Sequence, residues 1–247
     1  MQSRRTLLGT VGVMGAVAVS GCFGILKLDV DVMADPATVS VDVVTDNGYE
    51  HVGTEPNEHH EEVAVFPLTT EFESTWWHAQ HRRIEREDAT EDGDGDGNAL
   101  IPDGTDDRVL ARFDVVSTPS ERVRDREVNP VAHLEHEELL EMFSADTGEG
   151  ELGEAFSAVL GDVTVSELSH VENVELDTLG EVIDLSVFEA TITHPEESGD
   201  GSSVRLYVGD VLHEGDIVVP VGVHDRDADG AEALYTLVEN LEHPVDL

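Results

Sequence analysis

An aspartate-rich run in the middle of the chain has the spacing of calcium ligands. Asp92, Asp94 and Asp96 alternate with glycines, and Asp103 stands at the twelfth place counted from Asp92. Alternate carboxylates with a turn glycine match the first half of a calcium loop, because Ca²⁺ prefers hard oxygen ligands. Calcium at Asp92, Asp94 and Asp96 is therefore one hypothesis. The other is a solvated loop, which arises readily in so acidic a chain.

A second aspartate run repeats this spacing near the end of the chain. Asp225, Asp227 and Asp229 alternate and are followed by Gly230, but the twelfth residue is Thr236. Neither run is expected to lie between the two helices that frame such calcium loops in proteins. The second run is thus the weaker calcium candidate.

Histidines offer another metal chemistry, since imidazole binds zinc and copper. His133 and His136 stand three residues apart on an expected helix, so both could face one ion. No further ligand can be nominated from the sequence. His78 and His81, on an expected strand, have odd spacing and should point to opposite faces. For all four, a solvated surface histidine is the alternative to a metal ligand.

Nucleophilic catalysis finds no motif in this sequence. Cys22 is the single cysteine, and no Gly-x-Ser-x-Gly elbow is present. We therefore expect a non-catalytic protein without a cofactor and nominate no catalytic residue. Trp76 and Trp77 are adjacent on an expected strand, so one indole should enter the core and the other should face solvent. The second indole would be a contact surface unless a helix or the membrane side covers it.

The first residues resemble an export signal that ends in a lipid attachment site. Arg4 and Arg5 precede an apolar run of 13 residues, 7–19, which is too short to span a bilayer. The run leads into Val-Ser-Gly-Cys, which resembles the lipobox of secreted lipoproteins. We expect residues 1–21 to be a removed twin-arginine signal peptide and Cys22 to carry a lipid. A plain signal-anchor helix is the alternative.

The composition predicts a protein adapted to concentrated salt. There are 55 acidic and 13 basic residues, and removal of residues 1–21 changes the net charge from −42 to −44. Such a surface repels itself at low salt, whereas molar salt shortens the screening length to about 3 Å. The 39% of hydrophobic residues argue against a disordered chain. Nucleic-acid binding is not expected, because no basic patch exists to contact phosphates.

The hydrophobic pattern predicts one α+β domain over residues 36–247, held by a lipidated tether over residues 22–35. Alternating apolar residues predict eight strands in an antiparallel sheet. They are 49–54, 61–68, 72–85, 109–117, 163–176, 182–193, 204–211 and 217–223. Helical spacing predicts core-facing helices over 131–143 and 231–242, whereas 37–46 fits a strand or a short helix and 151–160 can extend the first helix. Residues 87–107 form an acidic surface loop.

These segments combine into a two-layer fold of about seven or eight strands and two or three helices. The arginine pair, the Gly-Cys lipobox, Pro36–Ser40, Val115–Pro119, Asn129-Pro130-Val131 and the closing helix resemble a haloarchaeal family of lipoproteins without assigned function. The order of elements is also similar to the PsbP-like and Mog1-like α+β folds, whose members serve mainly as binding or accessory modules. This second likeness is an analogy of fold.

The resemblance implies an exported protein on the outer face of the cytoplasmic membrane of a halophile. Its partners would be the membrane, through the lipid on Cys22, and an unidentified envelope protein or small ligand. The expected function is that of a non-catalytic binding or accessory module. A calcium-binding lipoprotein that uses the aspartate loops is the alternative.

Overall fold

The structure is a computed structural model that describes residues 28–65, 68–85, 108–120, 122–123, 126–127, 129–143, 159–160, 163–193 and 201–247. Its strands are β1 (Leu28–Met33), β2 (Thr38–Val39), β3 (Glu50–Val65), β4 (Leu68–Glu85), β5 (Arg108–Pro119), β6 (Arg122–Val123), β7 (Arg126–Glu127), β8 (Thr164–Thr178), β9 (Glu181–Thr193), β10 (Ser202–Val208), β11 (Val211–His213), β12 (Asp216–Asp225) and β13 (Leu241–Glu242). The helices are α1 (Val41–Asp46), the short 3-10 helix η1 (Pro130–His133), α2 (His136–Met142) and α4 (Ala231–Glu239).

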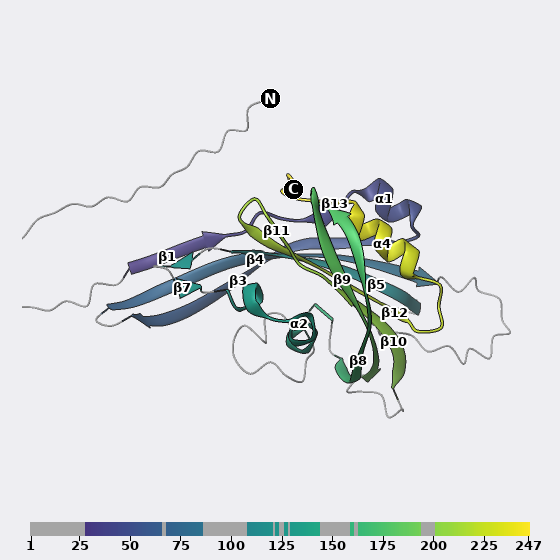
Figure 1. The fold of residues 1–247 in the computed structure, drawn as a ribbon. Helices are drawn as coiled ribbons and strands as arrows, with labels where there is room; N and C mark the ends of the chain where they lie inside the picture. Colours follow the sequence, from purple (N-terminus) through teal and green to yellow (C-terminus); the bar gives the residue numbers. More distant parts are fainter. Residues whose placement is uncertain are drawn as a thin grey trace, which may run out of the picture.

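One open sheet of nine strands organises the protein (Figure 1). Its order is β1-β4-β5-β12-β10-β9-β8, with β3 on the other edge of β4 and β11 beside β12. The β1 and β5 strands lie end to end along β4, because β1 pairs with residues 70–75 and β5 with residues 77–85. The α+β class and the helical layer against an open sheet confirm the predicted fold class.

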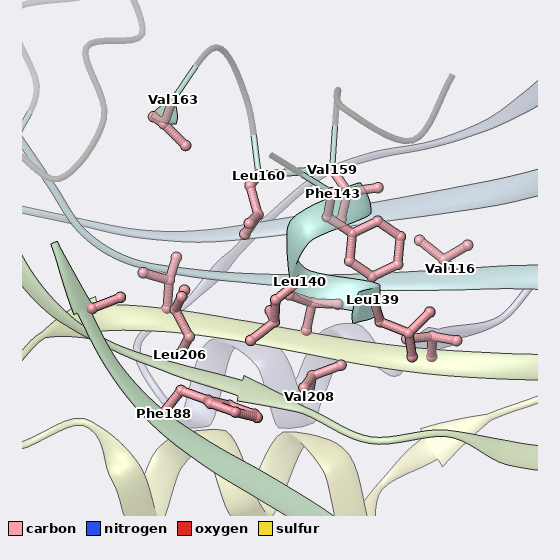
Figure 2. Close-up of a cluster of buried hydrophobic side chains, with 14 of the residues drawn as sticks. Val116, Leu139, Leu140, Phe143, Val159, Leu160, Val163, Phe188, Leu206 and Val208 are labelled. Atoms are coloured by element: carbon pink, nitrogen blue, oxygen red, sulfur yellow. The ribbon is translucent and has the colours of Figure 1, made fainter. Parts of the chain in front are cut away.

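Both faces of the sheet carry buried apolar side chains. On one face, α1 and α4 cover a cluster that includes Phe113, Leu185 and Leu234. On the other face, α2 and the residues Val159, Leu160 and Val163 cover a cluster that includes Val116 and Leu206 (Figure 2). This division follows from the alternation of side chains along each strand. The two faces therefore have separate cores.

Two hairpins of the sheet are closed by tight two-residue turns. Leu179 and Gly180 join β8 to β9, and Glu214 and Gly215 join β11 to β12. All four residues have positive φ angles, between 51° and 104°. Two-residue hairpin loops of this kind match the right-handed twist of the strands they connect. These turns fix the registers of both hairpins.

Three predictions about the tether and the strands need correction. The tether prediction extends too far, because Leu28–Met33 forms β1 instead of a free linker. Its Leu-Asp-Val-Asp-Val-Met sequence alternates as a half-buried strand does, and Val32 is buried. The sheet is also mixed, since β1 runs parallel to β4. Finally, the predicted strands 49–54 and 61–68 form one strand through Pro56, which an edge strand tolerates.

The helix predictions are correct in place and differ in length. Asn129 caps η1 by accepting a hydrogen bond from the Val131 amide at 3.0 Å, as the Asn-Pro pair predicts. The chain then breaks at Leu134 before α2 begins, so 131–143 is not one helix. The α4 helix ends at Glu239, and 37–46 contains both a short strand and a short helix. Residues 87–107 and 151–158 lie outside the described residues.

Asp216 joins the first and last described segments of the chain to the β11–β12 turn. Its Oδ2 accepts a hydrogen bond from the Asp35 amide at 2.8 Å and lies 3.1 Å from Nε2 of His243. The Asp216 and His243 residues are both buried. This carboxylate therefore holds the segment after β1 and the C-terminal segment in place.

We predict that Asp216→Ala lowers the free energy of unfolding by about 1–3 kcal/mol, because the buried His243 imidazole and the partly buried Asp35 amide lose their acceptor. Thermal unfolding in molar KCl measures the change. Asp246→Ala, at an exposed position of the same C-terminal segment, is the matched control and should unfold like the parent. Equal unfolding of the two variants would contradict the role assigned to Asp216.

Candidate functional site

A pocket of about 660 Å³ lies between the η1–α2 segment and the end of the sheet formed by β8 and β9. Its wall on the helical side runs from Ala132 to Glu137. The remaining lining residues are His170, Asn173, Asp184, Ser186, Phe188 and Asp210. The volume lies within the range that small-molecule sites occupy.

A hydrogen-bonded chain centred on His136 crosses this pocket. Nδ1 of His136 lies 2.6 Å from Oγ of Ser186, and Nε2 lies 3.0 Å from Oδ1 of Asp210. The Ser186 residue is buried on β9, whereas the Asp210 side chain is 54% exposed in the turn after β10. Helix, sheet and turn are thus joined through one imidazole.

The chain continues onto β8 through an amide. Oγ of Ser186 donates to Oδ1 of Asn173 at 3.0 Å, and Nε2 of His170 lies 2.7 Å from the same oxygen. The His170 ring also packs edge-on against Phe188, with a centroid distance of 5.3 Å. The pocket therefore combines polar groups with one aromatic surface.

The proton count along this chain decides what Ser186 can do. A hydroxyl has one proton, and here it is donated to Asn173. The His136 ring contacts the hydroxyl oxygen through Nδ1 and the Asp210 carboxylate through Nε2. A serine nucleophile instead needs an imidazole nitrogen that accepts its proton. In the structure the Ser186 hydroxyl donates to Asn173.

The sequence around His136 explains why α2 begins at the pocket and which face of the helix is buried. Glu135 and Glu138 form a reciprocal capping box, in which each side chain accepts from the other residue's backbone amide. Leu139, Leu140 and Phe143 are fully buried under the helix (Figure 2). The cap and the buried face together fix the orientation of the His136 ring.

The metal prediction for His133 and His136 is not supported by this arrangement. The two residues belong to separate helical segments, so the helical spacing that should bring them to one ion does not apply. The His136 ring is engaged by Ser186 and Asp210. Within the described ranges, no group of three histidine, cysteine or acidic side chains is placed to hold a metal ion.

The sequence-predicted site residues fall mostly outside the part of the chain that the structure describes. This holds for Arg4, Arg5 and Cys22, and for Asp92, Asp94 and Asp96, so lipidation and calcium binding there stay predictions. The second aspartate run is described. In it, Oδ1 of Asp225 accepts from the Asp227 amide at 2.9 Å, as in an ordinary turn. No described helix is long and apolar enough to cross a membrane.

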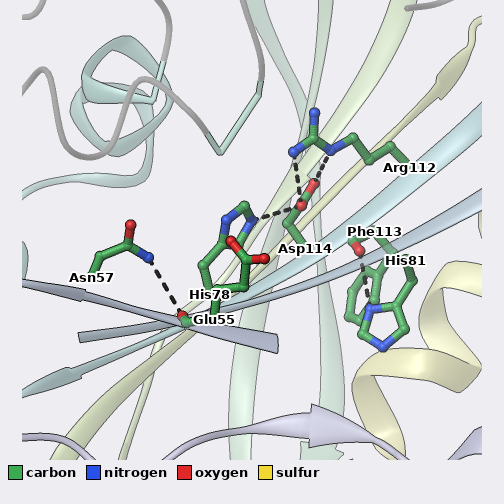
Figure 3. Close-up of polar contacts among 7 residues, drawn as sticks. All are labelled: Glu55, Asn57, His78, His81, Arg112, Phe113 and Asp114. Carbon is green, nitrogen blue, oxygen red and sulfur yellow. Dashed lines mark hydrogen bonds and ion pairs between the residues drawn. The ribbon is translucent and has the colours of Figure 1, made fainter. Parts of the chain in front are cut away.

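A buried polar network lies on the same face of the sheet as α2 (Figure 3). The Asp114 carboxylate contacts Nε of Arg112 at 2.7 Å and Nε2 of His78 at 2.8 Å. Its side chain is 1% exposed, so the two partners compensate for its desolvation. The Asp114 carboxylate thus links the His78 and Arg112 side chains. We assign the network to stability and not to ligand binding.

The opposite-face prediction for His78 and His81 is confirmed. His81 contributes to the face under α1 and α4, where it packs against Phe113 and Nδ1 lies 3.2 Å from the Phe113 carbonyl oxygen (Figure 3). Of the tryptophans, Trp76 is buried as expected. The second indole is not a free contact surface, because Trp77 is half-buried and donates to the Ala34 carbonyl at 2.9 Å.

Burial, with a smaller contribution from the neighbouring His51 ring, lowers the pKa of His81 from 6.5 to about 4. The unfolded chain therefore binds a proton that the folded protein excludes. Stability from this site is complete above pH 6.5 and is lost as the pH falls from 6.5 towards 4. The loss amounts to about 3 kcal/mol by the conversion of pKa shifts into free energy.

We predict that His81→Phe unfolds with a weaker pH dependence than the parent between pH 6.5 and 4. Urea unfolding at fixed KCl across this range measures the slope. Thr38→Val removes the hydroxyl that lies 3.3 Å from Nε2 of His81 but keeps the titrating ring, so it should retain the parent slope. Parallel curves for His81→Phe and the parent would refute the assignment.

Comparison with known proteins places the domain in a family. The chain matches no curated protein. Residues 36–242 match the family model described as a domain of unknown function, DUF6517. This match covers most of the chain and nearly all of the described domain. The chain therefore belongs to the DUF6517 family.

Proposed function

We propose that this protein is an exported, lipid-anchored and non-catalytic binding module of a halophile. It stands on the outer face of the cytoplasmic membrane, and its pocket takes a small ligand. The proposed localisation is supported by the leader with Arg4 and Arg5 and by the lipobox at Cys22. The excess of 55 acidic over 13 basic residues supports a halophilic source. The pocket beside His136 supports the binding role.

The observation that carries the binding role is the polar chain at the pocket wall. Three elements distant in sequence supply Ser186, Asn173 and His136 to one hydrogen-bonded chain beside a solvent-accessible volume. A few fixed polar groups next to an apolar surface are typical of ligand sites. Here Phe188 and Leu134 offer that surface.

The non-catalytic part of the proposal rests on proton placement. The Ser186 hydroxyl donates to Asn173, so its proton is not directed at His136. A hydroxyl fixed between two partners can orient a bound ligand. A hydroxyl that acts as a nucleophile must instead pass its proton to a base. The same chain thus suits recognition better than acyl transfer.

Obstruction of the pocket tests the binding role. We predict that histidine ring signals of His136 and His170 shift in a saturable way when millimolar amino acids, amines or sugars are added one class at a time in molar KCl. Ala132→Trp should abolish the shifts, because Ala132 lines the pocket and an indole there occupies its volume. NMR of histidine-labelled protein makes the measurement.

The matched control is Val41→Trp, which adds the same bulk at an exposed position on α1. This variant should keep the parent response. The binding role would be refuted if no compound class gave saturation, or if Ala132→Trp responded as the parent does.

A further inference from the structure

The start of β1 lies beside the closed end of the β3–β4 hairpin (Figure 1). Leu28 is the register partner of Thr70, whereas Val65 and Leu68 are the last pair of the hairpin. Only Thr69 separates Leu68 from Thr70 along β4. The described chain therefore begins next to this end of the hairpin and runs from there towards the body of the sheet.

The segment between the proposed lipid and this strand is short. It advances six residues from Cys22 to Leu28, and an extended chain gains at most about 3.5 Å per residue. Leu28 can thus lie no more than about 20 Å from the lipidated residue. A tether as long as residues 22–35 would have allowed more than twice this distance. The pairing of β1 instead holds the hairpin end near the bilayer.

The composition of the hairpin end differs from that of the rest of the chain. Val63–Val65 and Leu68–Thr70 contain no charged residue, although 28% of the whole chain is charged. Acidic residues return on both sides, with Glu61 and Glu62 before the segment and Glu71 and Glu73 after it. An uncharged end of this kind can meet lipid, whereas ionised carboxylates are costly to bury there.

We propose that this hairpin end, comprising Val63–Val65 and Leu68–Thr70, contacts the bilayer surface beside the lipid on Cys22. The inference rests on the proposed lipid anchor and adds a second contact to it. A single lipid chain binds a membrane only marginally, and a second signal makes the attachment stable. The flanking glutamates limit the depth of contact. Molar salt shortens the screening length to about 3 Å, so an anionic bilayer repels these glutamates only at close range.

This contact also orients the pocket. The sheet order places the β3–β4 hairpin and β1 on one side of the sheet and β8 at the opposite edge, and the pocket is built on β8 and β9. With the hairpin end at the bilayer, the pocket stays on the part of the domain that is remote from the membrane. A ligand can then enter from the surrounding solution.

A single introduced thiol tests the contact, because the one natural cysteine is occupied in the lipidated protein. Ala64→Cys is labelled with an environment-sensitive fluorophore in the full lipidated chain and reconstituted into vesicles whose lipids carry bromine on the acyl chains. We expect the emission to shift to the blue and to be largely quenched. Thr69→Cys, at the register partner of Ala64, should behave in the same way.

Val182→Cys and Val41→Cys are the controls, since both positions are exposed and lie on β9 and α1. Their labels should keep the emission measured with unbrominated lipid. If the protein sediments with the vesicles and the labels at 64 and 69 are quenched no more than the controls, the hairpin contact is wrong and the anchor stands. If the protein stays in the supernatant, the anchor fails and the contact fails with it.

Discussion

The parallel pairing of β1 with β4 sets the position of the whole domain relative to its N-terminal segment. Six residue pairs, from Leu28 and Thr70 to Met33 and Thr75, join the first described strand to the sheet. The chain that follows is fixed by Trp77, which donates to the Ala34 carbonyl, and by Asp216, which accepts from the Asp35 amide. The domain is therefore attached firmly at this edge, and any N-terminal anchor acts on it over a short distance.

Few basic residues are available to an acidic chain, and their placement is informative. Arg112 is buried against Asp114, and Arg205 and Arg226 both lie near Glu189, at 3.5 and 3.1 Å. The first pair compensates a buried carboxylate, whereas the exposed pairs contribute little in concentrated salt. The stability of this fold therefore depends mainly on the two apolar clusters and on buried hydrogen bonds.

The sequence predicted most of the fold because period-two alternation is strong in the long strands. It missed β1, since Leu28–Met33 is short and lies within residues 22–35, which were assigned to the tether. It also divided β3 at Pro56, because a proline usually ends a strand unless the strand lies at an edge. The parallel pairing could not be foreseen, since alternation does not specify which strand becomes a neighbour.

The pocket could be predicted only in part. Asn173 and Ser186 are register partners across the β8–β9 hairpin, so a two-residue turn at Leu179-Gly180 is enough to place them opposite each other. His136 and Asp210 reach the same pocket through tertiary packing, and no motif in the sequence relates them to Ser186. A hydrogen-bonded chain built from four separate elements leaves no local signal. The spacing of His133 and His136 predicted two ligands on one helix, but the two residues belong to the separate helices η1 and α2.

The most direct measurement is the intact mass of the full chain extracted from membranes of a halophilic host, with fragmentation of its N-terminal peptide. The account predicts a chain that begins at Cys22 and carries the added mass of a lipid there, and a Cys22→Ser protein that leaves the membrane fraction. A chain that begins at Met1 with an unmodified thiol would contradict it, as would a Cys22→Ser protein that remains fully membrane-bound.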